Sequence, residues 1–150
     1  MLYFIHILFF SLIATIKFQE VRQVPLPLSQ YQWENRLLLV FAKEKSDEQL
    51  LALKKQLKAE ADELKGRDIL VFYFFQDNSG EFEGKKLDEK EVEKLWKSYL
   101  PSREVTTLLL IGKDGGEKYR KTKGFDLNEI FSLIDGMPMR RQEMRQRGKN

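Results

Sequence analysis

A polar run follows an apolar segment of this chain at a point where catalytic side chains are common. Residues 43–47 read Lys-Glu-Lys-Ser-Asp and come directly after the apolar segment Leu37–Ala42. A thiol or hydroxyl at the start of a helix can act as a nucleophile, because the helix amides stabilise an anion there. The chain has no cysteine and its only histidine is His6, so neither a thiolate nor a histidine-activated Ser46 is available.

Ser46 has a structural interpretation as well. Gln49 follows it by three residues, which is the spacing of a capping box at a helix N-terminus. The strong preference for serine at this position favours a helix cap in a solvated loop. The alternative is a polar binding patch made by Lys43, Lys45 and Ser46.

An oxygen-rich segment between Asp77 and Asp88 has the alternating acidic spacing of a calcium loop. Its register fails, because Phe82 occupies the sixth position, where an EF-hand requires glycine, and Asp88 replaces the bidentate glutamate at the twelfth. We therefore predict a solvated loop over residues 76–86, with no metal site and no cofactor.

Aromatic residues could form a binding surface. Trp96 and Tyr99 fall on the apolar face of a predicted helix and are expected in the core. Trp33 and Phe82 are placed in loops, where a partner could contact them, so they are the aromatic candidates for a binding surface.

The C-terminus is the only strongly charged segment. Within residues 140–150, Glu143 is opposed by five basic residues: Arg140, Arg141, Arg145, Arg147 and Lys149. This arm could contact a membrane surface or another anionic component, be a frayed end, or pack back on the domain through its methionines. Nucleic acid is not expected as a partner, because no aromatic residues interleave the arginines.

Hydrophobic periodicity predicts one α/β domain over residues 31–139, followed by the basic arm at 140–150. Its central mixed sheet should have about four strands, in the order strand, helix, strand, helix, strand, strand, helix. The expected strands are 37–42, 69–75, 105–111 and 117–121, and the expected helices begin at Ser46, Asp88 and Asp126. The first helix should run for about five turns to Gly66.

The N-terminus is apolar and uncharged from Met1 to Ile16. This stretch is shorter than the roughly 20 residues that span a bilayer, so residues 1–19 are predicted to be a signal peptide. An uncleaved anchor is the alternative. We therefore expect an exported protein, periplasmic or extracellular, and its lack of cysteine means that it has no disulfide framework.

The strand at 37–42 entering a capped helix, together with Val105–Gly115, resembles the thioredoxin fold. The resemblance places the former thiolate at the junction of residues 43–47, and a threonine, Thr106, stands where that fold carries a cis proline. A trans peptide bond is therefore expected before Thr106, because a non-proline cis bond costs about 2.5–4 kcal/mol.

Three stretches resemble the signatures of the P-DUDES family, an uncharacterised family of exported bacterial proteins and sushi-repeat extracellular proteins. They are Trp33–Ala42, Leu110–Gly116 and Ile134–Arg145. The resemblance implies a thioredoxin-like domain without redox cysteines. It does not imply a mechanism, because fold alone does not determine function.

The expected function is that of an exported, cysteine-free binding or structural module of the cell envelope without catalytic activity. Its partner would be a protein or an anionic envelope component. A peroxiredoxin-like or disulfide-exchange enzyme is the alternative suggested by the fold, and the absence of every thiol disfavours it.

Overall fold

The computed structural model describes residues 28–148, so the predicted leader lies outside the described residues. Six strands form one mixed sheet in the order β4-β3-β2-β1-β5-β6. The strands are β1 (Arg36–Ala42), β2 (Ile69–Phe75), β3 (Gly80–Phe82), β4 (Lys85–Lys86), β5 (Thr107–Ile111) and β6 (Glu117–Lys121). The helices are the short 3-10 helix η1 (Leu28–Tyr31), then α1 (Glu48–Ala59), α2 (Ala61–Gly66), α3 (Glu89–Tyr99), α4 (Leu127–Asp135) and α5 (Pro138–Arg147).

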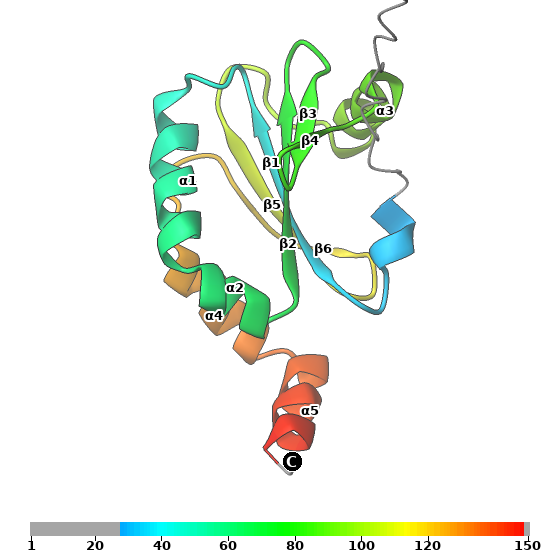
Figure 1. Cartoon of the computed structure of the whole chain (residues 1–150), viewed down its shortest axis with the longest axis vertical. Helices are drawn as coiled ribbons and strands as arrows, with labels where there is room; N and C mark the ends of the chain where they lie inside the picture. The colour runs from blue at the N-terminus through cyan, green and yellow to red at the C-terminus, as the bar shows by residue number, and fades with distance from the viewer. Residues whose placement is uncertain (1–27, 149–150) are drawn as a thin grey trace, which may run out of the picture.

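Strand β1 lies in the middle of the sheet, and every one of its seven residues is buried. It pairs in parallel with β2 and antiparallel with β5, so the connection through α1 and α2 is a crossover. Helices α1, α2 and α4 cover one face of the sheet, and α3 covers the other (Figure 1). The predicted α/β thioredoxin-like class is confirmed.

Each face of the sheet carries its own hydrophobic core. Alternate residues of β1 divide between them: Leu38 and Val40 pack toward α1 and α4, whereas Leu39 and Phe41 pack toward α3. This alternation follows from the two-residue period of a strand. The core beneath α3 is aromatic, with Phe41 against Trp96 at 5.1 Å between ring centroids.

The sheet has two more strands than expected, because residues 76–86 are not simply a loop. Glu83 and Gly84 have φ values of 50° and 74°, the left-handed pair that closes a tight hairpin between β3 and β4. Strand β3 also pairs antiparallel with β2. Phe82 therefore lies opposite Phe72, and the two rings stack with centroids 4.2 Å apart. The prediction that Phe82 sits in a loop is therefore wrong: its side chain is buried.

The first helix also differs from the prediction. It breaks at Glu60 (φ −102°, ψ 25°) into α1 and α2, and no proline or glycine marks the break in the sequence. Its cap is Asp47, whose side chain accepts a hydrogen bond from the backbone amide of Leu50, and Ser46 is not the cap. The predicted caps Asp88 and Asp126 of the later helices are confirmed.

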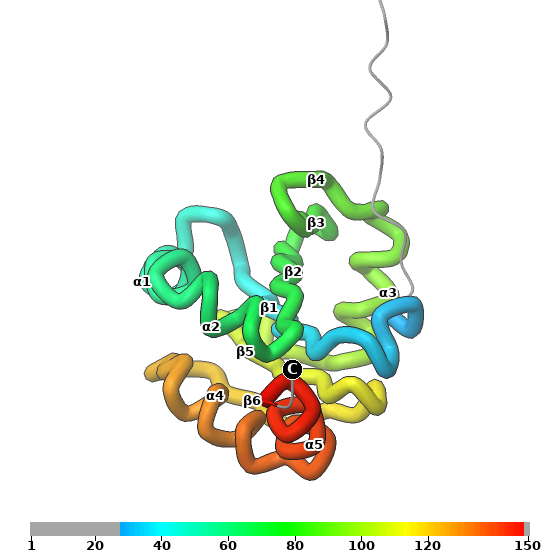
Figure 2. The backbone as a smooth tube through the Cα atoms, turned by 60° about the horizontal axis from the view of Figure 1, so that its bottom comes forward, coloured from blue at the N-terminus to red at the C-terminus, as the bar shows by residue number. Residues whose placement is uncertain are grey.

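The C-terminal segment is a helix that contacts one end of the sheet, at the start of β1. Figure 2 shows α5 following α4 at the lower end of the molecule, beside the ends of β1 and β2. The expected boundary between domain and arm at residue 140 falls inside α5. No helix within residues 28–148 is long and apolar enough to cross a membrane.

Candidate binding site

The junction after β1 is occupied by an aspartate. Asp47 Oδ1 accepts the α1 cap hydrogen bond from Leu50 and a second hydrogen bond, 2.8 Å long, from the hydroxyl of Thr106. Thr106 is fully buried, and the residues that the structure describes contain no cis peptide bond, so the predicted trans bond before it is confirmed. The positive end of α1 is thus compensated by a carboxylate of the chain itself.

Three residues of this loop were proposed as a polar patch. Lys43 and Ser46 are exposed. Lys45 forms an ion pair with Glu81, and its ammonium group lies 5.3 Å from the centroid of the Phe75 ring. Glu81 therefore offsets the charge that Lys45 would offer to an anionic partner.

Trp33 is the exposed aromatic residue near the other end of β1. It is 63% exposed, and its backbone amide donates a 2.6 Å hydrogen bond to the carbonyl of Lys113 in the β5–β6 turn. Trp33 has a φ of 71°, which is unusual for a bulky side chain. The bond to the turn fixes the backbone of this residue, and the exposed indole is accessible to a partner.

Charged side chains gather where β1 begins, at the opposite end of the sheet from Asp47. Arg36 is 1% exposed, and its guanidinium forms two hydrogen bonds with Glu143 of α5, at 3.2 and 3.1 Å. Lys113 of the β5–β6 turn lies 2.9 Å from the same carboxylate. Arg36 also donates to the carbonyl of Arg67, and its Nε has no partner among the described residues.

The cluster extends along the start of β2. Asp68 accepts from Lys113 at 2.9 Å and from Arg147, near the end of α5, at 2.9 and 3.0 Å. Arg147 also donates to the carbonyl of Gly66. The last turn of α5 is therefore tied to the residues that link α2 to β2.

A third group joins α4, α5 and α2. Asp135 accepts hydrogen bonds from Arg67 at 2.6 and 3.1 Å and from Arg140 at 3.2 Å. Arg67 lies over the ring of Phe131, 4.5 Å from its centroid. Arg140 is buried and donates to the Gly66 carbonyl. We call Arg36, Arg67, Asp68, Lys113, Asp135, Arg140, Glu143 and Arg147 the charged end of the molecule.

The cations of the charged end keep its carboxylates ionised. Burial would raise the pKa of Glu143, but hydrogen bonds and charges from Arg36 and Lys113 outweigh it, and the pKa lies below its ordinary value. Burial is likewise outweighed at Asp68 by Lys113 and Arg147, and at Asp135 by Arg67 and Arg140, so both pKa values are also lowered.

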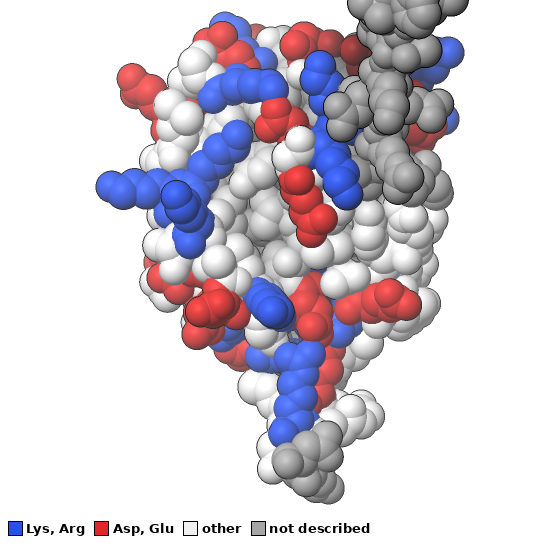
Figure 3. Space-filling view, viewed as in Figure 1, with Lys and Arg blue, Asp and Glu red and all other residues white. Residues whose placement is uncertain are grey.

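The predicted basic arm therefore divides into two sets. Arg140 and Arg147 are hydrogen-bonded to the body, whereas Arg141 and Arg145 are exposed. In Figure 3, basic and acidic side chains lie side by side at the lower end of the molecule, over α5. The arm is not a frayed end within the described residues, and only part of its charge is free for a partner.

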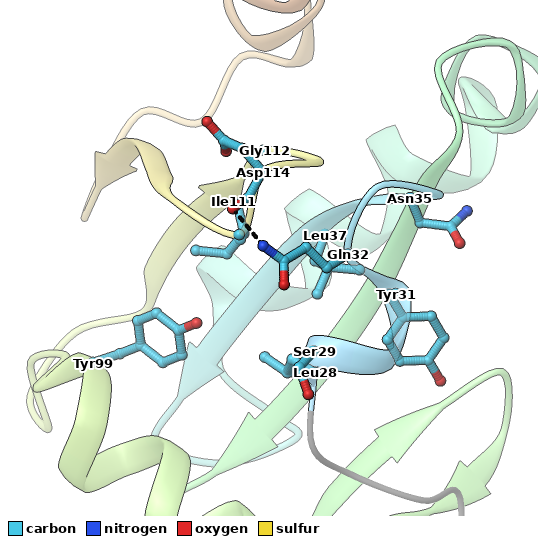
Figure 4. Close-up of a pocket in the computed structure, with 11 residues that line it drawn as sticks. Leu28, Ser29, Tyr31, Gln32, Asn35, Leu37, Tyr99, Ile111, Gly112 and Asp114 are labelled. Atoms are coloured by element: carbon cyan, nitrogen blue, oxygen red, sulfur yellow. Dashed lines mark hydrogen bonds between the residues drawn. The ribbon is translucent and has the colours of Figure 1, made fainter.

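Two cavities flank the β5–β6 turn. One, of about 250 Å³, lies between the turn and η1, where Tyr99 enters from α3 and Gln32 donates to the Asp114 carbonyl at 2.9 Å (Figure 4). The other, of about 300 Å³, lies between the turn and the start of α5; Arg36, Lys113 and Lys118 are among its lining residues. A wider groove of about 660 Å³ follows the start of β2.

Sequence reasoning did not single out Arg36, Lys113 or Glu143 as site residues. A signal was available, because each lies in one of the three signature stretches, which the fold brings together at the charged end. Within the described residues, no group of three or more histidine, aspartate and glutamate side chains is arranged to hold a metal ion.

Comparison with solved structures shows the fold. The reduced 2-Cys peroxiredoxin of Plasmodium vivax is 14% identical with a TM-score of 0.56, and the alignment covers 83% of this chain and 86% of that one. Thioredoxin peroxidase I of Plasmodium yoelii is 17% identical with a TM-score of 0.57, covering 78% and 80%. No curated protein matches the chain. Residues 27–143 match a family described as a domain of unknown function, DUF4174, and the chain belongs to that family.

Proposed function

We propose that this chain is an exported, non-catalytic binding module of the cell envelope, built on a thioredoxin-like fold. The observation that carries the proposal is the hydrogen-bonded pair of Asp47 and Thr106. In a redox enzyme of this fold, the start of α1 would stabilise a thiolate. Here a carboxylate that cannot form a disulfide takes that place.

The fold alone suggests an oxidoreductase as the alternative. Disulfide exchange requires a thiolate that forms a mixed disulfide, and peroxide reduction by this fold requires a sulfenic acid. The chain has no sulfur atom other than those of its methionines. This chemistry therefore supports binding as the role of the domain.

Export is supported by the uncharged apolar segment Met1–Ile16 and by the resemblance to the P-DUDES family. The surface proposed for a partner has two separate parts, both made of exposed residues: Lys43 and Ser46 at the junction after β1, and Trp33, Arg141 and Arg145 at the end of the sheet where β1 begins. Basic residues predominate among them, which favours an anionic partner. Phe82, Arg140 and Arg147 drop out of this surface, because the first is buried and the other two are bonded to the body.

The proposal is tested with protein purified from the envelope fraction. We expect no insulin-disulfide reduction and no peroxide consumption above buffer, with a thioredoxin as the positive control of the first assay and a cysteine-containing peroxiredoxin as that of the second. N-terminal sequencing should begin between about Thr15 and Val21 if the leader is cleaved. Turnover in metal-free buffer would refute the non-catalytic role, and recovery of the protein from the cytosol alone would refute export.

A further inference from the structure

Helix α5 is docked on the body without burying any apolar side chain of its own. Its one buried residue is Arg140, whereas Met139 and Met144 are 39% and 40% exposed. The neighbouring helix α4 is quite different, since Leu127, Ile130, Phe131 and Ile134 are all buried. Apolar burial normally dominates helix docking. Polar contacts therefore contribute much of the docking of α5, beside Met137 at its N-cap, which packs against the core beneath α4.

These contacts centre on the carboxylate of Glu143. Two nitrogens of Arg36 donate hydrogen bonds to it, Lys113 lies 2.9 Å away, and Arg140 lies 3.6 Å away. Paired hydrogen bonds between a guanidinium and a carboxylate are strong and geometrically specific. A buried guanidinium without a compensating anion is strongly disfavoured. The body of the domain therefore needs a carboxylate at this position.

The cations that define the position belong to the body. Arg36 starts β1 and Lys113 lies in the β5–β6 turn, whereas Glu143 arrives on a terminal helix joined to α4 through Gly136 and Met137. The cavity of about 300 Å³ reaches both cations from beside the start of α5. Exchanging one carboxylate for another at Arg36 would leave the charge balance of the buried site unchanged.

We propose that Arg36 and Lys113 form a carboxylate-binding site, that Glu143 occupies it as a ligand within the same chain, and that a protein partner binds by supplying a carboxylate in its place. The spacing on α5 defines the segment that fits. A basic side chain three residues before the carboxylate bonds to the Gly66 carbonyl, and another four residues after it bonds to Gly66 and Asp68. The partner segment is therefore a charged helix with this spacing.

Chemical rescue tests the site in the full-length protein. Glu143→Ala should melt at a lower temperature than wild type, and sodium acetate should raise its Tm by roughly 3 °C or more over sodium chloride of equal ionic strength. That increase should exceed the general stabilisation that acetate gives wild type relative to chloride. The matched control is Glu129→Ala. Glu129 of α4 forms a solvent-accessible ion pair with Lys121 of β6. Equal responses to acetate in the two variants would overturn the site.

Competition in trans tests displacement. A fluorescently labelled synthetic peptide of residues 136–147 is titrated with Glu143→Gln protein, and binding is followed by the fluorescence anisotropy of the label. The peptide should bind about tenfold more tightly than the same peptide carrying Gln at position 143. Equal binding of the two peptides would overturn the proposal. This test remains valid if Glu143→Ala fails to fold, because it uses Glu143→Gln protein. Neither experiment depends on export or on the absence of redox activity.

Discussion

At the scale of single residues, Asp47 makes two contacts, one of which, the helix cap, the sequence pattern assigns to Ser46. Its Oδ1 caps α1 through Leu50 and accepts the hydroxyl of Thr106. The neighbouring Ser46 is exposed and is not the cap. The cap is a local contact, but the bond to Thr106 spans 59 positions of the chain, and local spacing cannot reveal it.

Asp47→Ala should therefore be costly and Ser46→Ala should not. Loss of an N-cap costs about 1 kcal/mol, and leaving the hydroxyl of buried Thr106 without its acceptor adds a further 1 kcal/mol or more. We expect the free energy of unfolding to fall by roughly 2 kcal/mol in Asp47→Ala and to change by less than about 0.5 kcal/mol in Ser46→Ala. Urea unfolding measures both. A similar loss in the two variants would return the cap to Ser46.

At the scale of elements, α5 presents two different surfaces. Toward the body it offers Arg140, Glu143 and Arg147, and toward solvent it offers Arg141 and Arg145. The first set ties the helix to the charged end, so its charges are already compensated. The second set is available to bind an anionic surface. The sequence alone could not distinguish the two sets.

Binding to vesicles that contain phosphatidylglycerol tests the exposed surface. Attraction to an anionic membrane contributes ~1 kcal/mol per basic residue, so replacing both Arg141 and Arg145 with Gln should weaken binding roughly thirtyfold. The melting temperature of this double variant should equal that of wild type. Arg147→Gln should lower the melting temperature, because it breaks the bonds to Gly66 and Asp68.

The matched control removes two exposed lysines of α1, Lys55 and Lys58. This double variant should bind vesicles as wild type does, because α1 lies on a different part of the molecule from α5 (Figure 1). Equal weakening by the two double variants would mean that net charge alone drives binding and that α5 is not the contact surface.

At the scale of the whole molecule, stability depends on the charged end as well as on the two hydrophobic cores. Glu143, Asp68 and Asp135 have pKa values below their ordinary ones in the folded state. A lowered pKa contributes stability that is present above the unfolded-state value and is lost as the pH falls through the folded-state value. Glu143 joins α5 to β1, Asp68 joins the start of β2 to α5, and Asp135 of α4 pairs with Arg67 after α2 and Arg140 of α5, so protonation weakens contacts among all these elements.

The free energy of unfolding should therefore decrease as the pH falls from 6 to below about 4. Glu143→Gln lacks one of the three titrating carboxylates of the charged end, so its stability should be lower at pH 6 and should decline less steeply. Urea unfolding at several pH values measures both slopes. Parallel slopes for the variant and wild type would show that Glu143 does not contribute to the acid sensitivity.

The order of the main elements and the absence of cysteine could be read from the sequence alone. Local signals sufficed for these, because apolar runs, helix caps at Asp88 and Asp126, and a missing residue type are visible without any tertiary contact. Only the tertiary structure decided the charged end. Arg36 and Glu143 lie 107 positions apart, and a buried ion pair of that separation leaves no periodic trace in the chain. Phe82 is likewise buried through a pairing of strands: the turn between β2 and β3, closed by the hydrogen bond from Phe75 to Ser79, places it opposite Phe72.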